Sequence, residues 1–188
     1  QNPAGQNIKA AGNQFSMYFM PGVGGRALSA ENATETAKVV RAVQPDFVRV
    51  RTAVMKRGSG LWDDWQAGLY QPCSENEKLQ EIRTLIDETD GCDSHLVSDH
   101  VINLIQTLDG HLTHDRADLL GQIDEYFALP EETQRLYQIA RRSGGIMSPA
   151  QLDALSADSL LKYEEALRSI PPGEKWEMAL NDVMNGYI

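Results

Sequence analysis

The chain has 188 residues and a formal net charge of −10 at pH 7, with 41% hydrophobic and 23% charged residues. This length and composition predict a soluble globular protein with one domain, or with one domain and a small appendage. The negative charge argues against a nucleic-acid-binding surface, because phosphate contacts require clustered Lys and Arg side chains. No stretch is apolar enough to span a membrane, and no segment has the pattern of a secretory signal peptide.

The two cysteines bear on the cellular compartment. Cys73 and Cys92 form at most one pair, which is not a disulfide framework, so we expect a reducing compartment and a cytoplasmic location. The sequence begins Gln1-Asn2-Pro3 without Met, which indicates a processed product or a fragment of a longer protein.

The first strong pattern is an apolar strand that leads into a glycine-rich loop and a helix. After a frayed helix that stops at Gly12, residues 15–20 predict a strand, and Pro21-Gly22-Val23-Gly24-Gly25-Arg26 follow. Ser29 is expected to cap a helix with one apolar face, formed by Ala33, Ala37, Val40 and Val43. Such a loop lets a polar or anionic ligand approach backbone N–H groups, and an ordinary strand-to-helix turn is the alternative.

The clearest strand covers residues 46–52, where Val48 and Val50 alternate with Phe47, Arg49 and Arg51. Strand, helix and strand make a βαβ unit, so we expect a parallel sheet whose ligand site lies beyond the carboxyl ends of the strands. Residues 21–26 and 52–60 should therefore lie side by side. The two arginines either bind carboxylates or phosphates inside a barrel or are solvated on an outer edge.

Residues 53–74 form a long connection in which two tryptophans and a tyrosine suggest a lid, or else anchor the loop to the core. A capping box at Ser74 and Glu77 predicts a helix to about Thr89, and a short strand over residues 92–98 follows.

The rest of the chain is expected to be helical. We predict helices over residues 99–108, from Thr113 to about 127, from Pro130 to Arg142, after a capping box at Ser148, and over 158–170 and 174–185. The chain thus divides into an α/β part, residues 1–98, and an all-helical part, residues 99–188.

The four histidines fall close together in the sequence, at positions 95, 100, 111 and 114. Their spacings match no established zinc pattern, so we expect capping and surface roles for them. Ser98-Asp99-His100 contains the residue types of a hydrolase triad, but adjacent residues cannot converge as a triad must.

Several of these segments together resemble a known family. The run Met20-Pro21-Gly22-Val23-Gly24-Gly25 after a strand, Ser29 to Thr36 on a helix, and the strand Pro45 to Thr52 are similar to the second half of a radical S-adenosylmethionine (SAM) protein. Within that superfamily, Ser98 to Leu104 and Leu129-Pro130 with Arg141-Arg142 resemble the coproporphyrinogen oxidase-like and Elongator-subunit-like branches. The resemblance covers most of residues 8–145.

The resemblance implies a fold and a cofactor site. The family fold is a six-stranded partial (β/α) barrel, so this chain would be its C-terminal portion, with two or three parallel strands, followed by the helical region. Residues 19–25 would form the loop on the adenine side of SAM, and residues 48–51 the sixth strand. The cofactor-binding residues implied are Met20, Pro21, Gly22, Gly24, Gly25, Val50 and Arg51. Where the family usually has an acidic residue at the end of its glycine motif, this sequence has Arg26.

The sequence lacks the CxxxCxxC loop that holds the [4Fe–4S] cluster in this family. We therefore expect a fragment that binds no cofactor and is inactive alone, whose parent is an Fe–S oxidoreductase that uses [4Fe–4S] and SAM. Its expected partners are the missing N-terminal half and, in isolation, a second copy that pairs with its exposed edge strand; no nucleic-acid or membrane partner is expected. The alternative is a non-catalytic module that binds proteins through the helices of residues 99–188.

Overall fold

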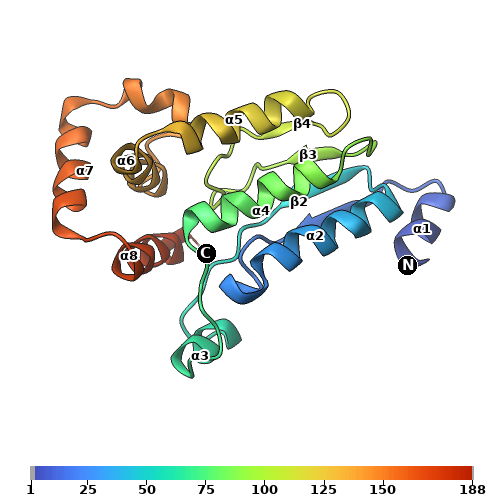
Figure 1. The fold of residues 1–188 in the computed structure, drawn as a ribbon, viewed down its shortest axis with the longest axis horizontal. Coiled ribbons are helices and arrows are strands. Elements are labelled where there is room, and N and C mark those ends of the chain that lie inside the picture. Colours follow the sequence, from blue (N-terminus) through green and yellow to red (C-terminus); the bar gives the residue numbers. More distant parts are fainter. Residues whose placement is uncertain (1–2, 188) are drawn as a thin grey trace.

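The computed structural model describes residues 3–187, which form an α/β fold dominated by helices (Figure 1). The strands are β1 (Ser16–Phe19), β2 (Phe47–Val50), β3 (His95–Val97) and β4 (Asp109–His111). They form a four-stranded sheet in the order β1-β2-β3-β4, in which the first three strands are parallel and β4 is antiparallel to β3. The helices are α1 (Pro3–Ala10), α2 (Gly25–Val43), α3 (Gly60–Gln66), α4 (Glu75–Glu88), α5 (Arg116–Ala128), α6 (Glu131–Arg142), α7 (Ala157–Ser169) and α8 (Glu174–Met184), with 3-10 helices η1 (Pro149–Ala154) and η2 (Asn185–Tyr187).

One face of the sheet is covered by helices. Figure 1 shows α2 and α4 side by side along the strands, and α5 packs beside α4. Consecutive parallel strands joined by right-handed crossovers place their connecting helices on the same face. The buried core between the two layers is apolar, and its strand residues are Phe19, Val48, Val50 and Leu96.

Within residues 3–187, no such helical layer covers the other face of the sheet. Its side chains form two registered rows, Ser16–Phe47–His95–His111 and Tyr18–Arg49–Val97–Asp109. Tyr18 is 62% exposed, and of these eight residues only Val97 is buried. Parallel sheets are normally covered on both sides, so this surface, called the open face below, is unusual for its class.

The helix predicted over residues 99–108 is not formed, and that prediction was wrong. The segment is a folded loop closed by the Ser98 N–H, which donates to the Leu108 carbonyl at 2.9 Å, and it leads into β4. Ile102, Leu104, Ile105 and Leu108 are buried, whereas Val101 is exposed. Asn103 is also buried and uses its amide to join β2 to the loop. A short apolar run fits a helix or a buried loop equally well, so the sequence pattern alone did not decide.

Other helices begin up to five residues from their predicted starts, and one helix was not predicted. Helix α2 begins at Gly25 rather than after Ser29, α3 lies within the connection predicted as a loop, and α5 begins at Arg116 rather than after Thr113. The capping boxes at Ser74 and Ser148 are confirmed.

The C-terminal helices return to the carboxyl end of the sheet. Figure 1 shows α7 set away from the sheet and α8 coming back toward the start of α4. The Trp176 ring of α8 is buried, and its Nε1 donates to Gln138 Oε1 of α6 at 2.6 Å. The Asn181 amide accepts from the Met55 N–H and donates to the Met55 carbonyl. Helix α8 is therefore fastened to the loop that follows β2.

The buried core is continuous from Phe19 to Ile146, so it includes residues on both sides of the boundary predicted at residue 98. Cys73 and Cys92 are both buried and free. In the part of the chain that the structure describes, no helix is long and apolar enough to cross a bilayer.

The hydrogen bonds of Asn103 predict a large effect on stability. Its Oδ1 accepts from the Thr52 N–H and Oγ1, and its Nδ2 donates to the Val50 carbonyl and to Ser98 Oγ. We expect Asn103→Ala to lower the free energy of unfolding by about 2–4 kcal/mol, because buried polar groups lose their partners. The measurement is urea denaturation at equilibrium. The exposed Asn13→Ala is the control, and an equal effect in both variants would contradict this role.

Candidate functional site at the carboxyl ends of the strands

The loops that follow β1 and β2 lie side by side, as the βαβ pattern predicts. The Arg51 N–H donates to the Phe19 carbonyl and the Ala53 N–H to the Pro21 carbonyl, both at 2.8 Å. These bonds extend the pairing of the two strands into the loops.

Four N–H groups of the glycine-rich loop already donate hydrogen bonds within the protein. Val23 N donates to the Met20 carbonyl at 3.3 Å, Gly25 N to the Gly22 carbonyl at 3.1 Å, and Arg26 N to the Gln71 carbonyl at 2.9 Å. Gly22 N donates to Glu81 Oε1 at 3.1 Å. These four groups are therefore not open to an incoming anion, in contrast to the simplest reading of the loop.

The Glu81 carboxylate takes the place that such an anion would have. It is buried on α4, and Ser29 Oγ donates to its Oε1 at 2.7 Å while Asn32 Nδ2 donates to its Oε2 at 2.6 Å. A buried carboxylate is tolerable only with several donors, and here the donors come from the loop and from α2. The sequence analysis missed Glu81, although its position three residues after Lys78 and four before Leu85 places it on the inward side of α4.

The residues predicted to contact SAM are brought together, but they differ in access. Met20 is 44% exposed, whereas Pro21, Gly22 and Gly25 are buried. Gly24 is partly buried. The Val50 side chain is fully buried in the core, and its carbonyl accepts from Asn103 Nδ2 and Arg51 Nη1.

The two arginines of β2 and its extension meet one carboxylate on the open face. Asp99 lies 2.9 Å from Arg51 Nη1 and 3.5 Å from Arg49 Nη1. The Arg51 guanidinium also lies 5.3 Å from the centre of the Tyr18 ring, a cation–π distance. These contacts place an aromatic ring and two cations together at the carboxyl edge of the open face.

The cysteines and histidines make separate contacts. Cys73 lies beside Glu81, and burial followed by that carboxylate raises the pKa of its thiol to about 11. Cys92 contacts Gln44 at the C-terminal end of α2, far along the helix from Gly25. His95 pairs with Asp109 at 2.5 Å, and His111 with Asp93 at 3.6 Å. Among residues 3–187, no group of three or more ligating side chains could hold a metal ion.

A separate cavity of about 180 Å³ lies beneath α8, and none of its lining residues belongs to the open face. It is bounded by the start of α2, the segment before α4, the first turn of α4, and α3 and α8. The lining residues are Arg26, Met55, Trp65, Gln71, Pro72, Cys73, Lys78, Glu174, Glu177, Met178 and Asn181.

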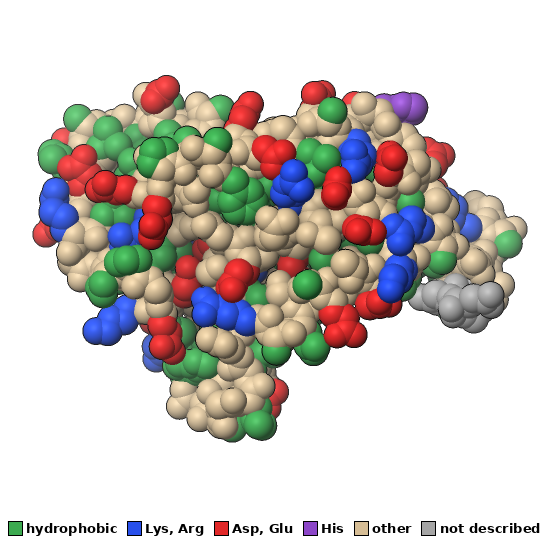
Figure 2. All heavy atoms as spheres, in the orientation of Figure 1, with side chains coloured by type: hydrophobic (Ala, Val, Ile, Leu, Met, Phe, Trp, Pro, Cys, Tyr) green, Lys and Arg blue, Asp and Glu red, His purple; other side chains and the backbone are tan. Residues whose placement is uncertain are grey.

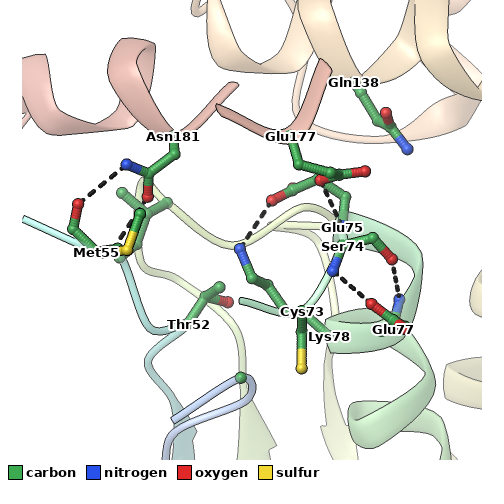
Figure 3. A network of polar contacts seen from close by, with 12 residues as sticks. Thr52, Met55, Cys73, Ser74, Glu75, Glu77, Lys78, Gln138, Glu177 and Asn181 are labelled. Atoms are coloured by element: carbon green, nitrogen blue, oxygen red, sulfur yellow. Dashed lines mark hydrogen bonds and ion pairs between the residues drawn. The ribbon is translucent and has the colours of Figure 1, made fainter. Parts of the chain in front are cut away.

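Four charged groups gather behind and along this cavity. Glu75 is fully buried, with an ion pair to Arg142 of α6 and a second pair to Lys78 Nζ at 3.3 Å. Burial acts to raise the pKa of Glu75, but the Arg142 and Lys78 cations outweigh it and hold that pKa below its ordinary value. Figure 3 shows Lys78 reaching toward Glu75, with Glu177 of α8 beside them.

The site shifts the pKa of the Glu177 carboxyl toward neutral pH. Its Oε2 accepts from the Glu75 N–H at 3.2 Å. Burial, followed by repulsion from Glu75, raises the pKa of Glu177 to about 7, although Lys78 and Arg26 act in the opposite direction. Glu177 therefore changes charge near neutral pH.

Comparisons with known proteins found no match. The chain matches no protein-family model, no curated protein and no solved structure.

The raised pKa of Glu177 predicts a pH-dependent stability. The folded state holds a proton that the unfolded state, with an ordinary pKa of 4.5, releases, so stability should fall as pH rises from about 4.5 to 7 and then level off. Between pH 5 and pH 8 we expect this group to cost about 1–3 kcal/mol, and Glu177→Gln to remove that loss. Chemical denaturation across this pH range measures it, with the exposed Glu165→Gln as control. Identical pH profiles for wild type and Glu177→Gln would contradict the assignment.

Proposed function

We propose that this chain is the C-terminal part of the catalytic barrel of a radical SAM Fe–S oxidoreductase, acting in the cytoplasm. The observation that carries the proposal is the open face: three parallel strands have helices on one side and mostly exposed or half-buried polar and aromatic side chains on the other. A parallel sheet with one bare face lacks a layer that its class normally has.

A barrel accounts for both faces. In a (β/α) barrel all helices lie outside, and the inward face of the sheet holds side chains and ligand. The order β1-β2-β3, with α2 and α4 on one side, suits a segment of such a barrel, whereas doubly wound sheets carry helices on both faces. The open face would then be the inner surface, completed by strands supplied from a separate N-terminal half.

The residues present suit the adenine side of the SAM site but not the side that would hold the [4Fe–4S] cluster. Met20 and Tyr18 offer an apolar and aromatic surface, and Arg51 adds a cation, which suits the adenine side of SAM. The cluster side does not fit this chain, because Cys73 and Cys92 lie apart, are buried, and number fewer than the three thiolates required.

In this proposal the chain is inactive alone and holds one wall of the site. When bound together, the cluster and SAM supply radical chemistry. The glycine loop, held by Glu81, would present the exposed Met20 to the cofactor, and Asp99 would orient the Arg51 guanidinium on the open face. The chain thus positions and shields the cofactor.

The direct test supplies the missing half. The chain would be assembled with a CxxxCxxC-containing N-terminal half, reconstituted with iron and sulfide and reduced with dithionite, and 5′-deoxyadenosine formation from SAM measured. We expect product only from the assembled protein, and at least a tenfold loss in Arg51→Ala, because the cation at the adenine side is removed. Arg57→Ala, in the same loop but exposed, is the control.

Two outcomes would contradict the proposal. One is 5′-deoxyadenosine formation by this chain without the cluster half. The other is an assembled protein whose turnover is unchanged by Arg51→Ala and by a bulky charged substitution at Met20.

The exposed edge also predicts self-association. Strand β1 pairs only with β2 among the described strands, and Tyr18, Met20, Val23 and Leu28 are exposed apolar or aromatic residues at or beyond it. Unpaired edges and apolar patches favour pairing with a second copy. We expect a dimer by light scattering after gel filtration, and a shift toward monomer in Tyr18→Lys. A monomer at all concentrations, with wild type and variant alike, would contradict the uncovered edge.

A further inference from the structure

We propose that the cavity beneath α8 is a binding site for a small zwitterion, a free α-amino acid with an apolar side chain. The cavity has no residue in common with the predicted SAM contacts Met20, Val50 and Arg51, so this inference is independent of the function proposed above.

The cavity has two walls of opposite charge. Helix α8 contributes Glu174 and Glu177, three residues apart on one side of the helix, and the first turns of α2 and α4 contribute Arg26 and Lys78. Figure 2 shows acidic and basic side chains close together on this face of the molecule, above the projecting α3. A ligand that carries one charge of each sign is paired on both sides, whereas a simple anion or cation leaves one wall uncompensated.

The charged groups keep hydrogen-bonding capacity for a ligand. Arg26 uses its Nε for Glu77 at 2.9 Å, and within residues 3–187 no partner is found for its two terminal nitrogens. In the same described range, Lys78 Nζ donates only to Glu75, and the Lys78 side chain is 11% exposed. Glu177 accepts from the Glu75 N–H through Oε2, with no partner found among the described residues for Oε1. A ligand carboxylate can therefore meet the two cations while its ammonium meets Glu177.

The charges act on one another across the cavity. Glu177 is held partly protonated near neutral pH by burial and by Glu75, while Lys78 and Arg26 lower its pKa. A bound ammonium adds a further positive charge beside Glu177 and favours its ionised form. Ligand binding at pH 7 should therefore release a fraction of a proton.

The volume of the cavity and its apolar lining favour a ligand with a small apolar side chain. Met55, Trp65, Pro72 and Met178 line the cavity between its charged walls. Its volume of about 180 Å³ is on the scale of a small ligand such as an amino acid. An aliphatic side chain would lie against these apolar residues.

The test is titration of this chain with L-leucine, followed by calorimetry and by amide chemical shifts. Matched probes remove one charge each: 4-methylpentanoate lacks the ammonium, and 3-methylbutylamine lacks the carboxylate. Glycine lacks the side chain. We expect a Kd for leucine of about 1 mM or tighter, and at least tenfold weaker binding of each matched probe.

Variants assign the binding to this cavity. Glu177→Gln and Arg26→Gln should each weaken leucine binding at least fivefold, and the exposed pair Glu165→Gln and Arg168→Gln serves as control. Binding enthalpy should also depend on the ionisation enthalpy of the buffer in wild type and not in Glu177→Gln. The inference would be overturned if leucine shows no binding at concentrations up to about 10 mM, or if 4-methylpentanoate binds as tightly as leucine. It would equally fail if both cavity variants bind like their controls.

Discussion

Two buried carboxylates on α4 hold the carboxyl end of the sheet together, and the rest of the structure depends on them. Glu81 fixes the glycine loop and the start of α2, and Glu75 pairs with Arg142 of α6 and supports α8 through its backbone N–H. A buried charge is tolerated only when its partners are correctly placed, so these pairs specify the arrangement of α2, α4, α6 and α8 more than they add net stability.

At the carboxyl end of the sheet, the side covered by helices and the open face have different features. On the helix side, the Glu75 cluster and α8 enclose a cavity with a group that titrates near pH 7. On the strand side, Tyr18, Arg51 and Asp99 lie at the surface without a covering layer. Polar groups of the open face are paired with one another, which lowers the free-energy cost of leaving a parallel sheet exposed to water.

Helix α8 connects the two regions. Its Asn181 clamps the backbone of Met55 in the loop after β2, and its Glu177 faces the cavity. A charge change at Glu177 therefore acts on a helix that also holds the loop following Arg51.

The sequence by itself determined the local elements. The alternation of residues 46–52, the capping boxes at Ser74 and Ser148, and the adjacency of the two loops after β1 and β2 all follow from rules that act over a few residues. Only the tertiary structure decided the roles of Asn103, Glu81 and Glu177. Each finds its polar partners in segments distant in the chain, so no local pattern distinguishes it from a surface residue. The same holds for the open face, because alternation shows that a strand has two faces and only the packing shows which one is left bare.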